Sequence, residues 1–184
     1  MPNYDDITKL VSILAAMREP FDHHGPAVAH LVMKMCTLLG MSEPESKLIH
    51  VGAFLHDIGK LRVDSELFNL PRQLTVNERA QVQLHAPLGW AIVEQAEYDS
   101  VILDIVRHHH ENWDGSGYPD GLKETEIPLA ARIVRICDVY QSMTNKRSYR
   151  EPYTHQFTFE FMEQGRGKLF DPNLLDLFFE KMAL

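Results

Sequence analysis

The chain has 184 residues, a net charge of −8 at pH 7 with histidine neutral, and two cysteines. A single domain of this length buries roughly 70% of the surface that its unfolded chain would expose, so it needs no disulfides to fold. The negative charge argues against binding a long nucleic acid, which requires a broad basic surface. No apolar run approaches the roughly 18 residues of a membrane helix. Cysteines without CxxC spacing, and an acidic start unlike an export signal, favour a reduced, cytoplasmic protein.

Apolar residues recur at helical spacing along most of the chain and never alternate convincingly at period two, so the sequence predicts an all-α fold. Capping boxes at Ser42–Glu45 and Thr75–Glu78 mark two helix starts. Gly40 and Gly59 mark two helix ends. The predicted helices span residues 4–18, 23–40, 42–57, 75–85, 88–97, 101–110 and 128–144, with a last helix from residue 172 onward.

Histidine and aspartate, which are ligand types that suit iron, manganese or zinc, occur near the predicted helix ends. His56 and Asp57 are adjacent, and neighbouring residues on a helix point roughly 100° apart. Both side chains therefore converge only at a helix end, which Gly59 supplies, or where two metals lie close together. The further candidates at helix or helix-end positions are His24, His85, His109, His110 and Asp138. The lack of thiolate candidates disfavours a structural zinc site.

Several of these residue types also have a more ordinary interpretation. A lone buried histidine is usually a hydrogen-bonded core residue, and we expect this of His30, His50 and His155. Within the run of three histidines, His108 has the weakest case as a ligand. Lys60 fits either an ordinary solvated lysine or a cation close enough to neutralise a phosphate bound at the metals.

A glycine-rich stretch follows the three histidines, within a loop predicted over residues 111–127. A loop of about seventeen residues in a compact domain indicates either function or disorder. Its glycines permit tight backbone turns against a ligand or partner. The alternative is a surface turn that Tyr118 and Pro119 pin onto the domain.

Four segments together resemble the HD-GYP domain, a branch of the HD phosphohydrolase superfamily: HDIGK, HHHENWDGSGYPDGLKETEIPLAARI, CDVY and TNKRSYR. The likeness runs from about residue 24 to residue 172, and the block of HHE and DGSGYP is highly specific. We therefore expect one HD-GYP domain over residues 1–184. The resemblance implies a helical fold, two or three bound metals, commonly iron or manganese, and hydrolysis of cyclic di-GMP or a related cyclic dinucleotide.

The resemblance also assigns roles residue by residue. The implied metal ligands are His24, His56, Asp57, His85, His109, His110 and Asp138. Asp57 would be the carboxylate that bridges two metals, and it is counted as catalytic together with Lys60, which matches the catalytic lysine. The implied substrate contacts are Gly117, Tyr118, Pro119, Arg147 and Arg150.

The chain departs from the pattern of the family at four positions. Members with three metals carry an acid four residues before the first histidine, where this chain has Pro20, and we therefore expect two metals. Gln141 stands where an aspartate is usual, Ser148 where a proline is usual, and Ala27 where an arginine is usual. None of these residues is an implied ligand.

The sequence thus predicts a metal-dependent phosphodiesterase that opens cyclic di-GMP to pGpG and, with a second cut, to GMP. A hydroxide bridging the metals would attack phosphorus, while Lys60, Arg147 and the metals would stabilise charge on the phosphoryl oxygens. Two alternatives remain: a module that binds a cyclic dinucleotide or a cyclase domain with little catalysis, and an HD hydrolase of another nucleotide. A cyclase domain or a sensor protein is a candidate partner; a membrane is not.

Overall fold

The computed structural model describes residues 24–68, 70, 72–146 and 151–182, and within this part of the chain there are helices but no strands. The all-α fold class is therefore confirmed. The α-helices are α2 (His24–Leu38), α3 (Glu43–Leu55), α4 (Val76–Gln83), α5 (His85–Gln95), α6 (Ser100–His108), α7 (Leu129–Thr144), α8 (His155–Gln164) and α9 (Pro172–Met182). Three short 3-10 helices are η1 (Ile58–Arg62), η2 (Ser65–Phe68) and η3 (Glu124–Glu126). The helix predicted over residues 4–18 lies outside the described residues.

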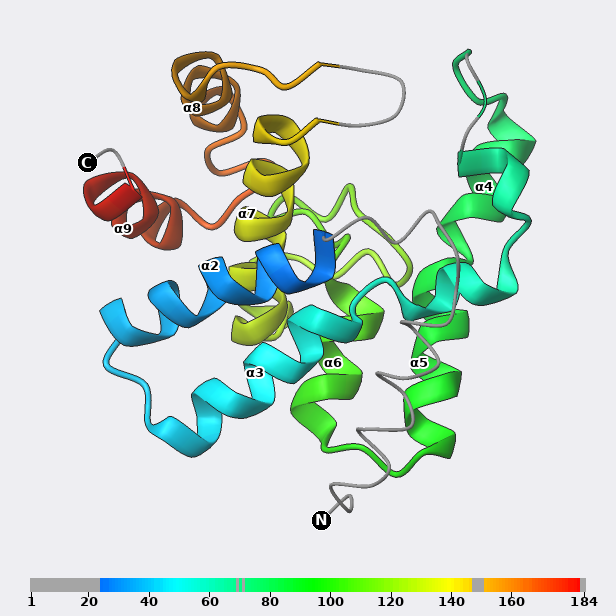
Figure 1. The fold of residues 1–184 in the computed structure, drawn as a ribbon, viewed down its shortest axis with the longest axis horizontal. Coiled ribbons are helices and arrows are strands. Elements are labelled where there is room, and N and C mark those ends of the chain that lie inside the picture. Colours follow the sequence, from blue (N-terminus) through cyan, green and yellow to red (C-terminus); the bar gives the residue numbers. More distant parts are fainter. Residues whose placement is uncertain (1–23, 69, 71, 147–150, 183–184) are drawn as a thin grey trace.

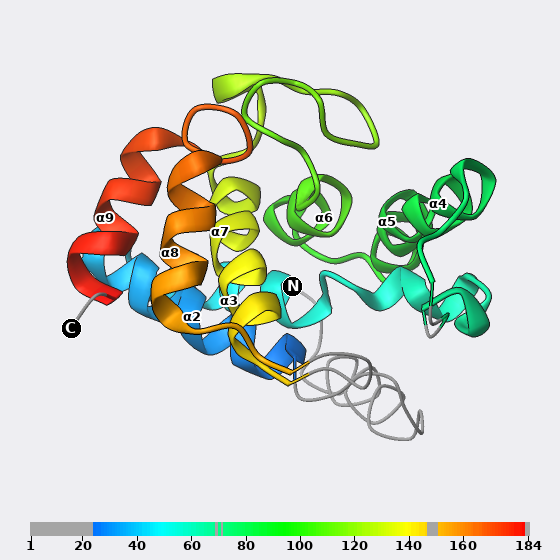
Figure 2. The same cartoon turned by 90° about the horizontal axis from the view of Figure 1, so that it is seen from above.

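The helices form a bundle with α7 near its middle (Figure 1). Helix α2 packs against α3 and α7, and α3 packs in turn against α6. Helices α8 and α9 lie against α7 on the side away from α4 and α5, as both views show (Figures 1 and 2). The short η1 packs against α5, so the segment after α3 is held against α5.

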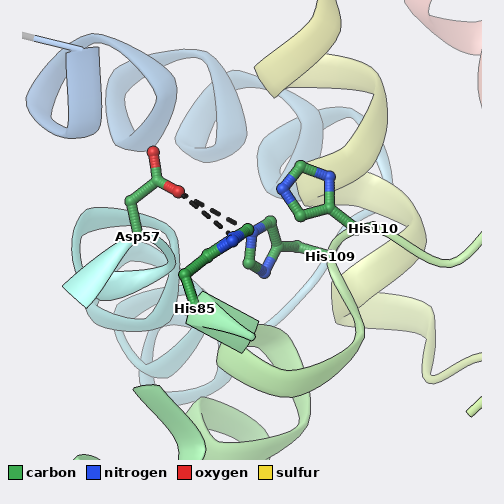
Figure 3. Close-up of side chains that lie close together, drawn as sticks. All are labelled: Asp57, His85, His109 and His110. Carbon is green, nitrogen blue, oxygen red and sulfur yellow. Dashed lines mark hydrogen bonds and ion pairs between the residues drawn. The ribbon is translucent and has the colours of Figure 1, made fainter. Parts of the chain in front are cut away.

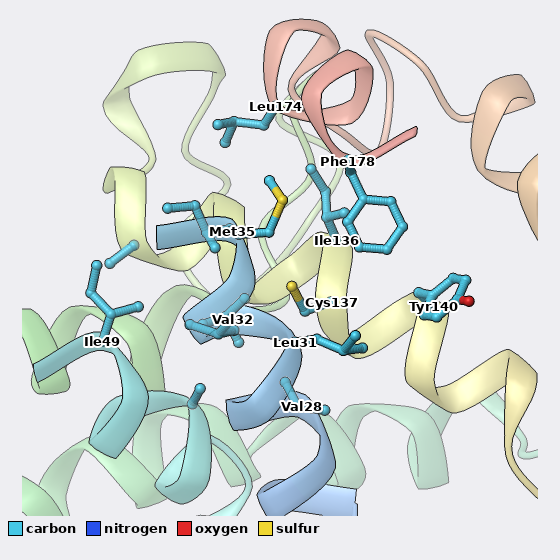
Figure 4. Packing of buried hydrophobic residues seen from close by; sticks show 14 of the residues in the cluster. Val28, Leu31, Val32, Met35, Ile49, Ile136, Cys137, Tyr140, Leu174 and Phe178 are labelled. Carbon is cyan, nitrogen blue, oxygen red and sulfur yellow. The ribbon is translucent and has the colours of Figure 1, made fainter. Parts of the chain in front are cut away.

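Two hydrophobic clusters hold these helices together. The larger cluster joins α2, α3, α7, α8 and α9, and includes Val32, Met35 and Phe178, all fully buried (Figure 4). The smaller cluster includes Leu55 and Ile58, which flank the His56–Asp57 pair in the sequence. Full burial of one such side chain contributes roughly 1.5–3 kcal/mol. The smaller cluster therefore fixes the backbone on both sides of the pair.

The capping boxes predicted at Ser42 and Thr75 are both present. The helix predicted over residues 88–97 instead begins at His85, and the helix predicted over residues 101–110 ends at His108. Leu84 has helical backbone angles between α4 and α5, so the two helices follow each other without a loop. Helix α8 has no counterpart among the predicted helices. Within the described residues, no helix is long and apolar enough to cross a membrane.

The histidines expected in the core lie elsewhere. His30 and His155 are exposed, so the expected core position is wrong for both of them. His155 nevertheless has a hydrogen bond of 2.8 Å between its Nδ1 and the hydroxyl of Tyr140. His50 is half-buried, with its Nδ1 3.3 Å from the carbonyl oxygen of Ala29.

Candidate metal centre

The seven candidate ligands come together where several helices begin or end. His24 and His85 are the first residues of α2 and α5, and His56 and His109 directly follow α3 and α6. Asp138, in α7, faces the same place, with its Oδ1 2.8 Å from Nε2 of His24. Helix ends allow adjacent side chains to turn toward one point, whereas adjacent residues inside a helix diverge.

Gly59 allows Asp57 to approach His85. A Cβ atom at Gly59 would lie 1.8 Å from the carbonyl oxygen of His85 and 2.5 Å from the amide nitrogen of Gly89. Any larger residue would therefore push η1 away from α5 and move Asp57 out of reach. The glycine is required here for close backbone packing, in addition to following the end of α3.

Asp57 belongs to two groups of side chains whose ligand atoms lie within 4.8 Å of one another. We call position 1 the group of His24, His56 and Asp57, together with Asp138. We call position 2 the group of Asp57, His85, His109 and His110 (Figure 3).

The shared aspartate turns a different oxygen toward each position. Its Oδ2 lies 3.4 Å from Nε2 of His56, and its Oδ1 lies 3.5 Å from Nε2 of His85 and 4.0 Å from Nε2 of His109. Two atoms bound to one metal at about 2.1 Å lie about 3 Å apart when they meet at a right angle and farther apart at wider angles. The spacing thus fits two metal positions joined by the carboxylate of Asp57.

The orientation of the rings fits the same arrangement. Nδ1 lies 2.6 Å from a backbone carbonyl oxygen in His56, 2.7 Å in His85 and 3.0 Å in His109. A carbonyl only accepts, so each Nδ1 carries the proton and each neutral ring keeps a lone pair on Nε2. The lone pairs of His85 and His109 face each other at 3.3 Å, which is repulsive without a cation between them. Nε2 of His56 is buried without a hydrogen-bond partner among the described residues.

Most of the candidate ligands have the protonation state that a metal requires. Burial disfavours charge on Asp57 and Asp138. Lys60 and His56 outweigh burial at Asp57, and the hydrogen-bonded His24 together with His56 outweighs it at Asp138, so the pKa of both carboxyls stays well below the usual range. Burial also holds the pKa of His109 well below the ordinary histidine value, so this ring stays neutral. Burial lowers the pKa of His56, but Asp57, Asp138 and the carbonyl of Ala53 together outweigh burial and raise the pKa above the ordinary histidine value. Ionised carboxylates and neutral imidazoles are the forms that bind metals.

The predicted catalytic lysine lies at the edge of the centre. The ammonium of Lys60 forms an ion pair with Oδ2 of Asp57, and the Lys60 side chain is partly exposed. The same ammonium lies 5.5 Å from the ring centroid of Phe68, at the end of η2. Lys60 is therefore a donor next to the shared carboxylate.

The Gly117–Pro119 segment packs directly on His110. A Cβ at Gly117 would lie 2.3 Å from the amide nitrogen of Asn112 and 2.6 Å from the carbonyl oxygen of His110. The ring of Tyr118 stacks on the ring of His110 with centroids 4.8 Å apart, and a cis peptide bond links Tyr118 to Pro119. The loop therefore supports one of the candidate ligands. Arg147 and Arg150 lie outside the described residues.

The loop is anchored by two contacts, and the sequence predicted neither of them. Glu111 is buried, and its Oε1 accepts hydrogen bonds from the backbone N–H groups of Asp120 and Gly121. The second contact is made by the carboxylate of Asp120, which forms ion pairs with Arg107 and His108. His108 therefore takes no part in the centre. The position of Glu111 directly after the three histidines was a signal for such a role.

Arg135 is a second residue that sequence reasoning missed. Its guanidinium reaches both Nδ1 of His110 and the side-chain oxygen of Asn112. Arg135 precedes Asp138 by three residues, and residues three apart lie on one face of a helix. That spacing could have identified it as a neighbour of the centre.

The fold and the centre define a class of helical domains with a histidine- and aspartate-rich centre. Known proteins of this class match the chain. The HD domain family matches residues 9–174. The chain is 36% identical over 151 residues to the cyclic di-GMP phosphodiesterase response regulator RpfG of Xanthomonas campestris, covering 81% of this chain and 40% of that protein. It is 32% identical over 176 residues to the 3′3′-cGAMP-specific phosphodiesterase 2 of Vibrio cholerae, covering 95% of this chain and 34% of that protein.

The solved structure of Bd1817, an HDG"Y"P protein from Bdellovibrio bacteriovorus, matches the fold. It aligns with a TM-score of 0.73 at 20% identity, covering 96% of this chain and 58% of that one. The chain belongs to the HD domain family. The resemblance to the HD-GYP branch is confirmed by these relatives together with the fold. The chain spans less than half the length of the two curated relatives named above.

Proposed function

We propose that the chain is a metal-dependent phosphodiesterase that hydrolyses cyclic di-GMP to pGpG and/or GMP. The observation that carries the proposal is the pair of ligand groups that share Asp57 through different oxygens. Two relatives support a cyclic dinucleotide as the substrate, because one is named as a phosphodiesterase of cyclic di-GMP and the other as a phosphodiesterase of 3′3′-cGAMP.

The proposal includes two divalent metals, iron or manganese. Position 1 would hold one with His24, His56, Asp57 and Asp138, and position 2 the other with Asp57, His85, His109 and His110. Nitrogen and oxygen ligands without thiolates suit these metals. When bound, such metals polarise phosphoryl oxygens and lower the pKa of water.

The side chains of the chain itself would orient and stabilise the reacting phosphate. Lys60 presents its ammonium beside Asp57, where it can donate to a phosphoryl oxygen as negative charge develops there. Tyr118 and Gly117 hold His110 in place from the loop. Arg147 and Arg150 are proposed as further phosphate contacts on the grounds of the family resemblance.

The domain is proposed to be a single HD-GYP unit over residues 1–184 that works with a sensor or cyclase domain as partner. Location in the cytoplasm is part of the proposal. The free, buried cysteines Cys36 and Cys137 fit a reducing compartment.

The test is turnover by protein purified without oxygen and loaded with iron or manganese. Cyclic di-GMP, 3′3′-cGAMP, linear pGpG and a mononucleotide would be supplied separately, and products followed by chromatography. The expected result is turnover of a cyclic dinucleotide that His109→Ala loses and His30→Ala, a substitution of an exposed histidine, retains. A fully metal-loaded protein that cleaves no cyclic dinucleotide would refute the proposal, and exclusive turnover of the mononucleotide would favour a different HD hydrolase.

A further inference from the structure

Among the candidate ligands, four histidines have a contact at Nδ1, and these contacts are of two kinds. In His56, His85 and His109 the outer nitrogen Nδ1 faces a backbone carbonyl oxygen. In His110, Nδ1 instead faces Nη1 of Arg135 at 3.5 Å. A carbonyl can only accept a hydrogen bond and a guanidinium can only donate one, so the two environments require opposite tautomers.

The orientation of the His110 ring determines which of its two nitrogens faces the metal centre. Figure 3 shows one ring nitrogen of His110 turned toward Asp57 and His109 and the other turned toward α7, the helix that carries Arg135. Since Nδ1 is the nitrogen that accepts from Arg135, a neutral His110 carries its proton on Nε2. The nitrogen directed at the centre then lacks the free lone pair that His85 and His109 present.

The arginine is itself held in place by the glycine-rich loop. Its Nη2 donates to Oδ1 of Asn112 at 2.9 Å, and Nδ2 of Asn112 donates to the hydroxyl of Ser116 at 3.1 Å. The ring of Tyr118 covers the face of His110. The loop therefore fixes both the ring and the donor that faces its outer nitrogen.

We propose that Arg135 is a positioning residue that holds His110 in the Nε2–H tautomer and so makes position 2 the weaker and later-filled metal position. To bind a metal through Nε2, His110 must move its proton to Nδ1, which gives up the bond to Arg135 and points an N–H at a guanidinium. At position 1 no tautomer has to change, because Nδ1 of His56 already faces a backbone carbonyl oxygen. The inference rests on the proposed metal centre, but it makes a statement about the metal-free protein.

The first test is the tautomer of each histidine in the metal-free 184-residue chain, measured from the ring ¹⁵N shifts in long-range ¹H–¹⁵N spectra. His110 is assigned by comparison with His110→Asn. The expected result is the Nδ1–H tautomer for His85 and His109 and the Nε2–H tautomer for His110. An Nδ1–H tautomer at His110 in the wild-type chain would overturn the proposal without any variant.

The second test compares Arg135→Met with Arg135→Lys, which keeps the charge and a donor-only group. Arg135→Met should release His110 from the Nε2–H tautomer and tighten the second of two Zn²⁺ binding events by about 10-fold, the lower end of the effects of groups behind metal ligands. Arg135→Lys should leave the tautomer as in the wild type. Arg79→Met, at an exposed arginine on α4, controls for the lost charge.

An unchanged His110 spectrum in Arg135→Met would overturn the role of the arginine. If the variant does not fold, as judged by circular dichroism, the wild-type spectrum still decides the proposal. Failure to hydrolyse a cyclic dinucleotide would refute the proposed function and leave the tautomers as measured. The two failures are therefore distinguishable.

Discussion

Positions 1 and 2 share Asp57 but are built from different surroundings. Position 1 contains a second carboxylate, Asp138, which lies 2.8 Å from His24 and is held ionised. Position 2 adds three histidines, and one of them, His110, is supported by a loop and an arginine. The comparison teaches that a list of ligands does not determine how strongly each position binds. The groups behind the ligands make the two positions unequal.

The shared carboxylate gives the largest expected effect. Asp57→Ala should remove the metals from both positions and lower turnover by about 1,000-fold or more, because both positions lose a ligand and a charge. Metal content by elemental analysis and turnover of cyclic di-GMP measure the two losses. Asp64→Ala, at an exposed aspartate seven residues downstream, is the control and should retain both. Retention of one full metal equivalent in Asp57→Ala would mean that the carboxylate does not join the positions.

The next prediction asks whether Lys60 supports turnover without taking part in metal binding. Lys60→Ala should lower turnover by about 100-fold, the scale of one donor to a transition state, while keeping the metals. The variant also frees Asp57 from its ion pair, so metal affinity should not fall. A variant with normal turnover would remove Lys60 from the mechanism.

Gly117 tests whether the loop acts on one position alone. Gly117→Ala places a methyl group 2.3 Å from the amide nitrogen of Asn112, and overpacking of this kind costs about 1–3 kcal/mol of stability. We expect a weaker second metal-binding event and an unchanged first one, measured by titration with Mn²⁺ or Zn²⁺. Equal weakening of both events would show that the loop supports the whole centre.

The sequence predicted the fold class, both capping boxes and the residues that converge on the centre, because each of these has a local signature. Helix α8, in contrast, has a misleading sequence pattern. Its phenylalanines repeat every second residue over Phe157–Phe161, which hides the helical pattern, and the helix buries Thr158 and Met162 instead. Phe157 and Phe161 remain 47% and 40% exposed. Apolar periodicity therefore indicated no helix there.

The sequence positions of Glu111 and Arg135 indicate that both lie near the centre, but their contacts were beyond the sequence. Both are charged side chains close to histidines, and a charge near a histidine predicts neither the atom it contacts nor the direction of the hydrogen bond. The contact of Arg135 with Nδ1 of His110 depends on how α7 lies against the loop. Only the packed structure determines that distance.

Tyr118 gives a smaller effect on the same position. Loss of a stacked aromatic pair costs about 0.5–1.5 kcal/mol, so Tyr118→Ala should weaken the second metal-binding event by about 2- to 10-fold. Tyr118→Phe keeps the ring and should bind as the wild type does. Isothermal titration on both variants makes the comparison. A matching loss in Tyr118→Phe would assign the effect to the hydroxyl and contradict the role of stacking.

The smallest expected effect is the release of a proton from position 1. The raised pKa of His56 means that the metal-free protein keeps a proton there at pH values where an ordinary histidine has lost it. Metal binding must expel that proton, whereas the lowered pKa of His109 leaves none to expel at position 2. Titration near pH 7 in buffers of different ionisation enthalpy should show release of up to about one proton. The release should vanish as the pH rises through the pKa of His56, and its persistence in His56→Ala would contradict this assignment.

The most direct test of the shared centre is to locate the metals by anomalous scattering in crystals of the 184-residue chain loaded with manganese. The account predicts two peaks about 3.5–4 Å apart, each next to a different oxygen of Asp57, with the lower occupancy beside His110 when manganese is limiting. A single peak at saturating manganese, or two peaks without Asp57 between them, would contradict it.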